Sequence, residues 1–189
     1  MFKSLILSVL FVLLANCGGS SSQKNDTVTN TYNSTIPTLS ADNIAIPDNS
    51  EVNDYKVLFF GNSHVVGIPS LLKTLIEHGL PEKTAYMIST ASGDYLQERL
   101  SNPASVELLT SNQWSHVVLQ AQKYSQSGLV DYPTIAAQTW VQLAKSQNTT
   151  PVLFPEHPQR DHDNEGRKVH DLHLSIAALQ ASCVAPVGL

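Results

Sequence analysis

Val57-Leu58-Phe59-Phe60-Gly61-Asn62-Ser63-His64 is the stretch of this 189-residue chain that decides its predicted fold. The apolar run 55–60 is compact and rich in Val, Leu and Phe, and Gly61 closes it, which is typical of a buried strand. Apolar residues then recur on one face of a predicted helix, 64–78, in which Pro69 is expected to kink the helix or delay its start. A buried strand that leads directly into a helix indicates an α/β fold.

The rest of the domain repeats this alternation of apolar strands and helices. Further strands are predicted at 84–90, 116–120 and 151–155, helices at 95–110, 133–147 and 164–181, and the start of a fifth strand at 184–187. Such alternation implies a mostly parallel sheet that helices cover on both faces. The predicted fold class is therefore a flavodoxin-like, three-layer α/β/α arrangement around a mostly parallel five-stranded sheet.

Three residues stand just beyond the carboxyl ends of predicted strands: Ser63, Gly93 and Gln122. Sites in parallel sheets form at this edge. A Ser that opens a helix is well placed as a nucleophile, because the free N–H groups and partial positive charge of the helix N-terminus favour an anion beside it. The same position also suits a helix N-cap, a role that Ser often fills. Position alone leaves both interpretations open.

The residues around Ser63 resemble the first block, Gly-Asp-Ser-Leu, of the SGNH or GDSL-type hydrolases. The segments 89–93 and 116–122 resemble the second and third blocks, and Gly-Asn-Ser with Leu-Gln-x-Gln is similar to a less studied branch of that superfamily. The resemblance implies that Ser63 is the nucleophile and that Gly93 donates a backbone N–H to the oxyanion hole. It also implies that Gln122 takes the place of the family's Asn side chain, and it implies no cofactor.

The family's last block, Asp-x-x-His, has no counterpart beyond the fourth predicted strand. We therefore expect a domain shortened at its C-terminus, either as a fragment or as a truncated gene product, or a different His as the base. His157, just past that strand, is the candidate base within the chain, with Glu156 or Asp161 to orient it; a polar loop residue is the simpler interpretation. His64 is a poor base for Ser63, because adjacent side chains at a helix start diverge. A substrate contact or a solvated position is expected for His64.

The segment 156–173 also permits a hypothesis of metal-dependent chemistry. His170 and His173 can share one face of a helix, and imidazoles and carboxylates suit zinc. No spacing in this segment matches a specific metal signature, so a charged, solvated loop and helix start explains it equally well, and we expect no metal.

The N-terminus predicts export. The apolar run 5–14 follows Lys3 and is shorter than the ~20 residues of a membrane-spanning helix, which is typical of a signal peptide. Leu14-Ala15-Asn16-Cys17 resembles a lipoprotein lipobox, which implies a lipid on Cys17; a plain secretory signal with an incidental Cys is the alternative. Residues 1–17 are thus predicted to be the signal and lipobox, 18–50 a disordered Ser/Thr/Asn-rich tether, and 51–189 the hydrolase-like domain.

The sequence therefore predicts a serine ester hydrolase anchored by its lipid in the bacterial cell envelope, at the outer membrane facing the periplasm. The resemblance implies acyl esters as substrates, with acetylated carbohydrates among them. A formal net charge of −5 argues against a nucleic-acid partner, which would favour clustered Lys and Arg. The absence of the last block motivates an alternative: a non-catalytic envelope lipoprotein that uses the same fold to bind a ligand.

Overall fold

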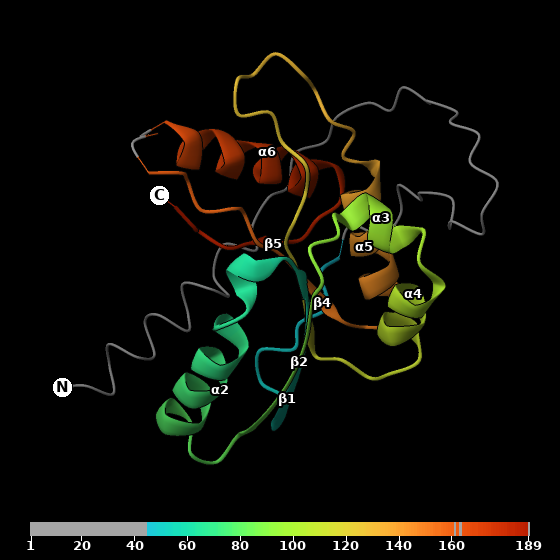
Figure 1. The fold of residues 1–189 in the computed structure, drawn as a ribbon. Coiled ribbons are helices and arrows are strands. Elements are labelled where there is room, and N and C mark those ends of the chain that lie inside the picture. The colour runs from blue at the N-terminus through green and yellow to red at the C-terminus, as the bar shows by residue number, and fades with distance from the viewer. Residues whose placement is uncertain (1–44, 161, 163, 189) are drawn as a thin grey trace.

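The computed structural model describes residues 45–160, 162 and 164–188, and Figure 1 shows their arrangement. Strands and helices alternate as the sequence predicts. The strands are β1 (Asp54–Gly61), β2 (Thr84–Ala91), β3 (His116–Leu119), β4 (Thr150–Leu153) and β5 (Cys183–Val184). The helices are η1, a 3-10 turn (Ser63–Val65), α2 (Ile68–Gly79), α3 (Leu96–Leu100), α4 (Pro103–Thr110), α5 (Ile135–Ser146) and α6 (Glu165–Leu179).

All the strands pair in parallel in one sheet, in the order β2-β1-β3-β4-β5. The register brings the carboxyl ends together: Phe60 in β1 pairs with Thr90 in β2 and with Leu119 in β3, and Leu119 pairs with Leu153 in β4. The prediction of an α/β fold with a parallel five-stranded sheet is confirmed. Whatever follows these strands lies at one edge of the sheet.

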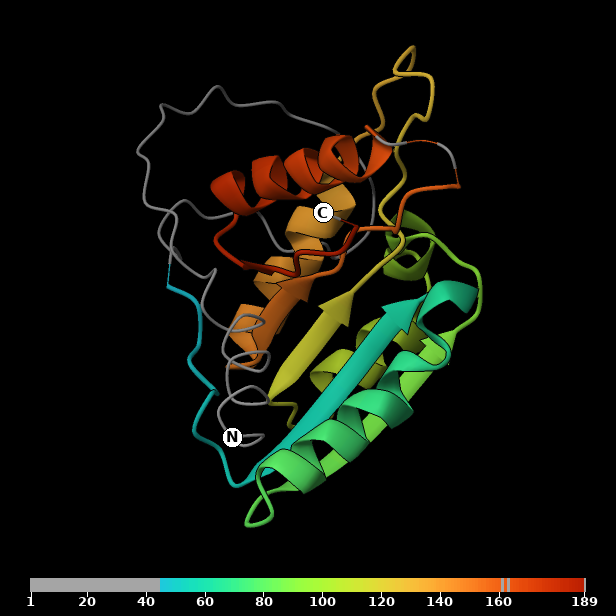
Figure 2. The same ribbon diagram turned by 90° about the vertical axis from the view of Figure 1, so that its left-hand side faces the viewer.

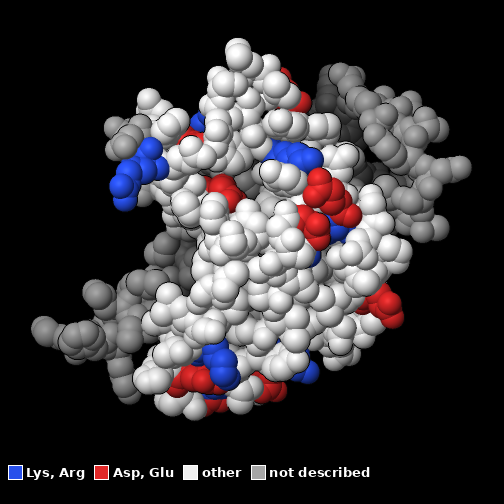
Figure 3. Space-filling model, in the orientation of Figure 1, with Lys and Arg blue, Asp and Glu red and all other residues white. Residues whose placement is uncertain are grey.

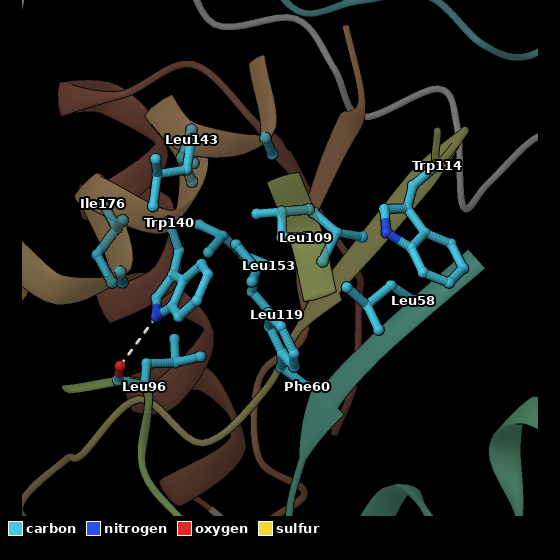
Figure 4. Packing of buried hydrophobic residues seen from close by; sticks show 14 of the residues in the cluster. Leu58, Phe60, Leu96, Leu109, Trp114, Leu119, Trp140, Leu143, Leu153 and Ile176 are labelled. Carbon is cyan, nitrogen blue, oxygen red and sulfur yellow. Dashed lines mark hydrogen bonds between the residues drawn. The ribbon is translucent and has the colours of Figure 1, made fainter. Parts of the chain in front are cut away.

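The two faces of the sheet bury different sets of side chains. On one face, Leu58 and Phe60 pack with Trp140 of α5 and with residues of α3, α4 and α6. Figure 4 shows this cluster, in which the Trp140 indole N–H donates to the Leu96 carbonyl at 2.9 Å. On the other face, Val57 and neighbouring odd-numbered residues pack with α2. Figure 2 shows the resulting layers, with α2 on one side of the strands and α5 on the other.

The helix after β1 starts late, one of the two effects predicted for Pro69. Ser63 opens only a three-residue 3-10 turn, and α2 starts at Ile68 with Gly67 as its N-cap and Pro69 near its first turn. Pro69 suits a first helical turn because its missing N–H is not needed there. The strand expected at 184–187 is limited to β5, 183–184. Among the described residues, no helix is both long and apolar enough to span a bilayer.

Candidate active site

Ser63 lies directly beyond β1, exposed at the carboxyl edge of the sheet. The N-cap of its turn is Asn62, whose side-chain oxygen accepts a hydrogen bond from the His64 N–H at 2.9 Å. The N-cap interpretation of Ser63 is therefore wrong, and so is the expectation that it opens an α-helix, because α2 starts five residues later. Among the described residues, the Ser63 hydroxyl and N–H have no hydrogen-bond partner. Ser63 is thus free to meet a ligand.

Glu156, three residues beyond β4, links the ends of three strands. Its carboxylate accepts hydrogen bonds from the Asn62 amide at 3.2 Å, from the Gln120 amide and from Nδ1 of His64. The Gln120 amide oxygen in turn accepts the Asn62 N–H at 2.7 Å. Hydrogen bonds to an ionised carboxylate are the strong ones. The Glu156 network therefore holds the turn that carries Ser63 from the side of β3 and β4.

Two imidazoles lie together beside Glu156. The rings of His64 and His157 are stacked with their centroids 4.4 Å apart, and both residues are exposed. Nδ1 of His157 lies 3.0 Å from the Pro158 carbonyl oxygen, which can only accept, so this nitrogen carries the proton. Nδ1 of His64 faces the Glu156 carboxylate in the same way. With Nδ1 as the donor, Nε2 of each ring is the nitrogen that can accept a proton.

The turn after β2 carries Gly93 on the other side of Ser63. Gly93 has φ +80°, a left-handed conformation that favours Gly, and its N–H has no partner among the described residues. The buried Arg99 of α3 holds this turn: its guanidinium donates to Thr90 Oγ1 at 2.9 Å, to the Thr90 carbonyl and to Ser92 Oγ at 2.8 Å. It also donates to the Gly61 carbonyl at 2.8 Å. Arg99 thus joins the ends of β1 and β2.

Gln122 is buried just beyond β3, but its amide group is engaged elsewhere. Its Nε2 donates to the carbonyls of Lys123 at 2.9 Å and Pro133 at 3.2 Å, which occupies both amide protons. The amide that faces the Ser63 turn belongs to Gln120, the last residue before the chain turns away from β3. An oxyanion role for Gln122 stays a prediction, and it requires this side chain to leave its two carbonyls.

Comparisons with known proteins bear on this arrangement. Neither models of protein families nor curated proteins match the sequence. Among solved structures, a protein from Slackia heliotrinireducens that is provisionally assigned as an SGNH hydrolase matches with a TM-score of 0.53 and 20% identity, covering 70% of this chain and 78% of that one. The crystal structure of TesA matches with a TM-score of 0.48 and 14% identity over 70% of this chain and 78% of that one, and this likeness adds no weight.

The chain has the SGNH hydrolase fold. The three residues that the sequence singled out, Ser63, Gly93 and Gln122, follow β1, β2 and β3 of this SGNH fold at one edge of the sheet. The structure brings the turns of Ser63 and Gly93 together across the β1–β2 pair. It places His157 beside His64, and Glu156 beside both Asn62 and Gln120.

Sequence reasoning missed Arg99 and Gln120 at this edge of the sheet. Arg99 lies in a short helix, where the sequence predicts an exposed Arg. Its hydrogen-bond partner Gly61 is 38 positions away, so no local pattern indicates the contact. The sequence gives one weak indication for Gln120, which is a polar residue at the end of a buried apolar strand. Gln122 was assigned to the site in its place, because Gln122 occupies the position of the family's Asn.

The metal hypothesis for the segment 156–173 stays a hypothesis, because residues 161 and 163 lie outside the described part of the chain. His170 and His173 are buried on α6, and burial lowers the pKa of His173. No group of three or more His, Cys, Asp or Glu side chains with metal-binding geometry occurs among the described residues. Asp161 and the lipid site predicted at Cys17 lie outside the described residues. On the face in Figure 3, Lys and Arg form small separate groups interspersed with Asp and Glu.

Proposed function

We propose that this protein is a serine esterase that hydrolyses acyl esters in the bacterial cell envelope. The observation that carries the proposal is Ser63, an exposed hydroxyl without a partner among the described residues, at the carboxyl edge of an SGNH-type sheet. Sites of parallel sheets form at this edge. The Ser63 turn is held from both sides, by Arg99 at Gly61 and by Gln120 at Asn62, so the nucleophile would be presented in a fixed position.

In the proposed reaction, Ser63 Oγ attacks the acyl carbonyl and forms a tetrahedral anion. The N–H groups of Ser63 and Gly93, which have no partner among the described residues, would donate to that oxyanion. Each such donor contributes roughly 3 kcal/mol to the transition state. The bond between the carbonyl carbon and the alcohol oxygen then breaks, and the Ser63 proton leaves with the alcohol. Water next adds its hydroxide to the acyl group and returns a proton to Ser63.

We assign the proton transfer to the imidazole pair at Glu156. His157 carries its proton on Nδ1 and presents Nε2 as an acceptor. His64 is held on the Glu156 carboxylate, which suits a contact with the leaving alcohol. Replacing His157 with Asn should lower the rate of the esterase about 100-fold, the usual contribution of a general base. An unchanged rate in this variant would mean that His157 is not the base. The base would then be another His, as in the family, where the Asp-x-x-His block supplies it.

The proposed substrate class is supported by the resemblance and by the exposure of Ser63. An exposed nucleophile can accept a bulky alcohol, and acetylated carbohydrates fit an enzyme of the envelope. Hydrolysis of acetylated xylo-oligosaccharides should exceed that of long-chain acyl esters. The envelope position rests on the lipid predicted at Cys17, so Cys17→Ser should abolish incorporation of labelled palmitate in cells.

The decisive experiment is labelling with a fluorophosphonate probe. The wild-type protein should be labelled once and Ser63→Ala not at all. Ser70→Ala, which removes an exposed hydroxyl from α2, should be labelled as the wild type is. Labelling that survives in Ser63→Ala overturns the assignment. A wild-type protein that is never labelled but binds acetylated oligosaccharides in calorimetry would favour the non-catalytic alternative.

A further inference from the structure

Arg99 is a buried cation at the catalytic edge for which the proposed reaction has no direct use. Its side chain is 2% exposed and reaches from α3 back to the ends of β1 and β2. The guanidinium lies over the Phe60 ring, 5.4 Å from its centroid. A buried charge is costly unless it is paired, so its place in the fold calls for a physical reason.

The hydrogen bonds of Arg99 end on neutral groups. They reach the Gly61 carbonyl, both oxygens of Thr90 and the Ser92 hydroxyl. No carboxylate among the described residues lies within ion-pair distance of Arg99; the nearest link is through Ser92, whose hydroxyl donates to Asp94 at 2.5 Å. A neutral side chain could not donate in so many directions, because only the guanidinium offers five N–H groups in one plane.

The two backbone segments that Arg99 joins carry the two proposed oxyanion donors. Gly61 precedes Ser63 by two residues, and Ser92 directly precedes Gly93. β1 and β2 pair only as far as Gly61 and Ala91, so beyond that register no ladder hydrogen bond holds the two turns together. The Arg99 fork lies at this gap. A shift of one turn relative to the other would change the distance between the Ser63 and Gly93 N–H groups.

We infer that Arg99 is a positioning residue of the oxyanion site: it sets the separation of the Ser63 and Gly93 N–H groups. Its charge, which no carboxylate of the described residues neutralises directly, also favours the anion formed between them. This inference rests on the proposed esterase function. It gives α3 a role in positioning the oxyanion donors, which the resemblance to the family does not imply.

The test compares variants of the full-length protein with p-nitrophenyl acetate and the fluorophosphonate probe. Arg99→Met should lower kcat about 100-fold and leave KM within about threefold, the signature of lost transition-state stabilisation. Arg99→Lys keeps the charge but not the fork and should recover part of the loss, about tenfold. Gln97→Met introduces the same side chain at an exposed position of α3 and should match the wild type.

Thr90→Val keeps the test decisive if Arg99→Met does not fold. It removes one acceptor of Arg99 at nearly constant volume, and kcat should fall severalfold at unchanged KM. If folded Arg99→Met or Thr90→Val has the wild-type kcat, the positioning role is wrong while the esterase stands. If instead the wild-type protein is not labelled at Ser63, the proposed function and this inference both fail. A rise in KM with constant kcat would assign Arg99 to substrate binding and overturn the inference.

Discussion

The turn that carries Ser63 is held by two networks of opposite charge. On the β2 side, Arg99 donates to the Gly61 carbonyl. On the β3 and β4 side, the Gln120 oxygen accepts the N–H of the next residue, Asn62, and Gln120 in turn donates to Glu156. The two networks thus form hydrogen bonds to adjacent residues of the same turn. A 3-10 turn too short to hold itself is positioned by side chains that come from elements distant in the sequence.

The two networks differ in exposure and in chemistry. Arg99 is buried and its partners on Gly61, Thr90 and Ser92 are neutral oxygens, none of which exchanges a proton near neutral pH. Glu156 contacts the exposed imidazole of His64, which stacks on the exposed imidazole of His157. Under the proposed function, the β2 side would be a rigid scaffold and the β4 side would transfer protons, and variants can test this division.

The largest effect is expected where the networks meet, at Gly61. An added Cβ would lie 2.5 Å from Val65 Cγ2 and 2.6 Å from the Gln120 amide oxygen. Gly61→Ala should therefore displace Gln120 from Asn62 and Glu156 and lower the free energy of unfolding by about 4 kcal/mol, the sum of overpacking and lost hydrogen bonds. Urea unfolding measures the change. Gly67→Ala, where no atom lies within 4 Å, should be nearly neutral; equal losses in both variants would contradict the clash.

A smaller loss is expected when only the Glu156 network is weakened. The Glu156 carboxylate accepts from Asn62, Gln120 and His64. In Glu156→Gln only one acceptor oxygen remains, and the new NH2 group, which cannot accept, lies against one of these donors. The free energy of unfolding should fall by about 2 kcal/mol. The rate of fluorophosphonate labelling should fall about tenfold, because Ser63 is less well placed for the proposed attack.

Glu107→Gln on the exposed face of α4 is the matched control for this change and should alter neither quantity. If Glu156→Gln labels at the wild-type rate, the β4 side does not serve the reaction, and the division of tasks between the two networks is wrong.

The pH dependence of stability should come from the opposite end of β3. Burial lowers the pKa of His116 from 6.5 to about 4, so between these values the unfolded chain binds more protons than the folded one. The neutral, buried His116 therefore causes no loss of stability above pH 6.5. As the pH decreases from 6.5 toward 4, the free energy of unfolding falls, by about 1 kcal/mol over the first pH unit. Urea unfolding from pH 4 to 8 should show this slope.

His116→Gln should flatten the slope, although the lowered pKa of His173 leaves part of it. His78→Gln, at an exposed position of α2, should leave the slope unchanged. A slope that disappears in His64→Asn but persists in His116→Gln would assign the effect to the Glu156 network instead.

The smallest effect is expected from surface contacts of the helix that carries Arg99. Glu98 accepts the Tyr95 N–H at 3.0 Å and the Lys123 ammonium at 3.2 Å, both in exposed positions. Glu98→Gln should lower the free energy of unfolding by less than about 1 kcal/mol and leave kcat unchanged. A fall in kcat like that of Arg99→Met would mean that this surface cap, rather than the buried fork, positions α3.

The outline of the site could be predicted because it follows from strand order. Ser63, Gly93 and Gln122 were singled out as residues just beyond strands, and parallel strands place such residues at one edge. The direction of each side chain could not be predicted in the same way. Gln122 and Gln120 are two residues apart and chemically identical, yet only Gln120 faces the Ser63 turn. That choice depends on how the chain turns after β3, where Ala121 has φ +77°.

The sequence by itself determined the alternation of apolar strands and helices, and with it the parallel sheet, because local hydrophobic patterns decide which segments are buried. It also determined that Ser63 stands just beyond the first strand. Only the tertiary structure decided what holds the turn that carries Ser63. Arg99 and Glu156 act across 38 and 94 positions of the chain, on Gly61 and Asn62, and hydrogen bonds between residues so far apart leave no periodic pattern in the sequence.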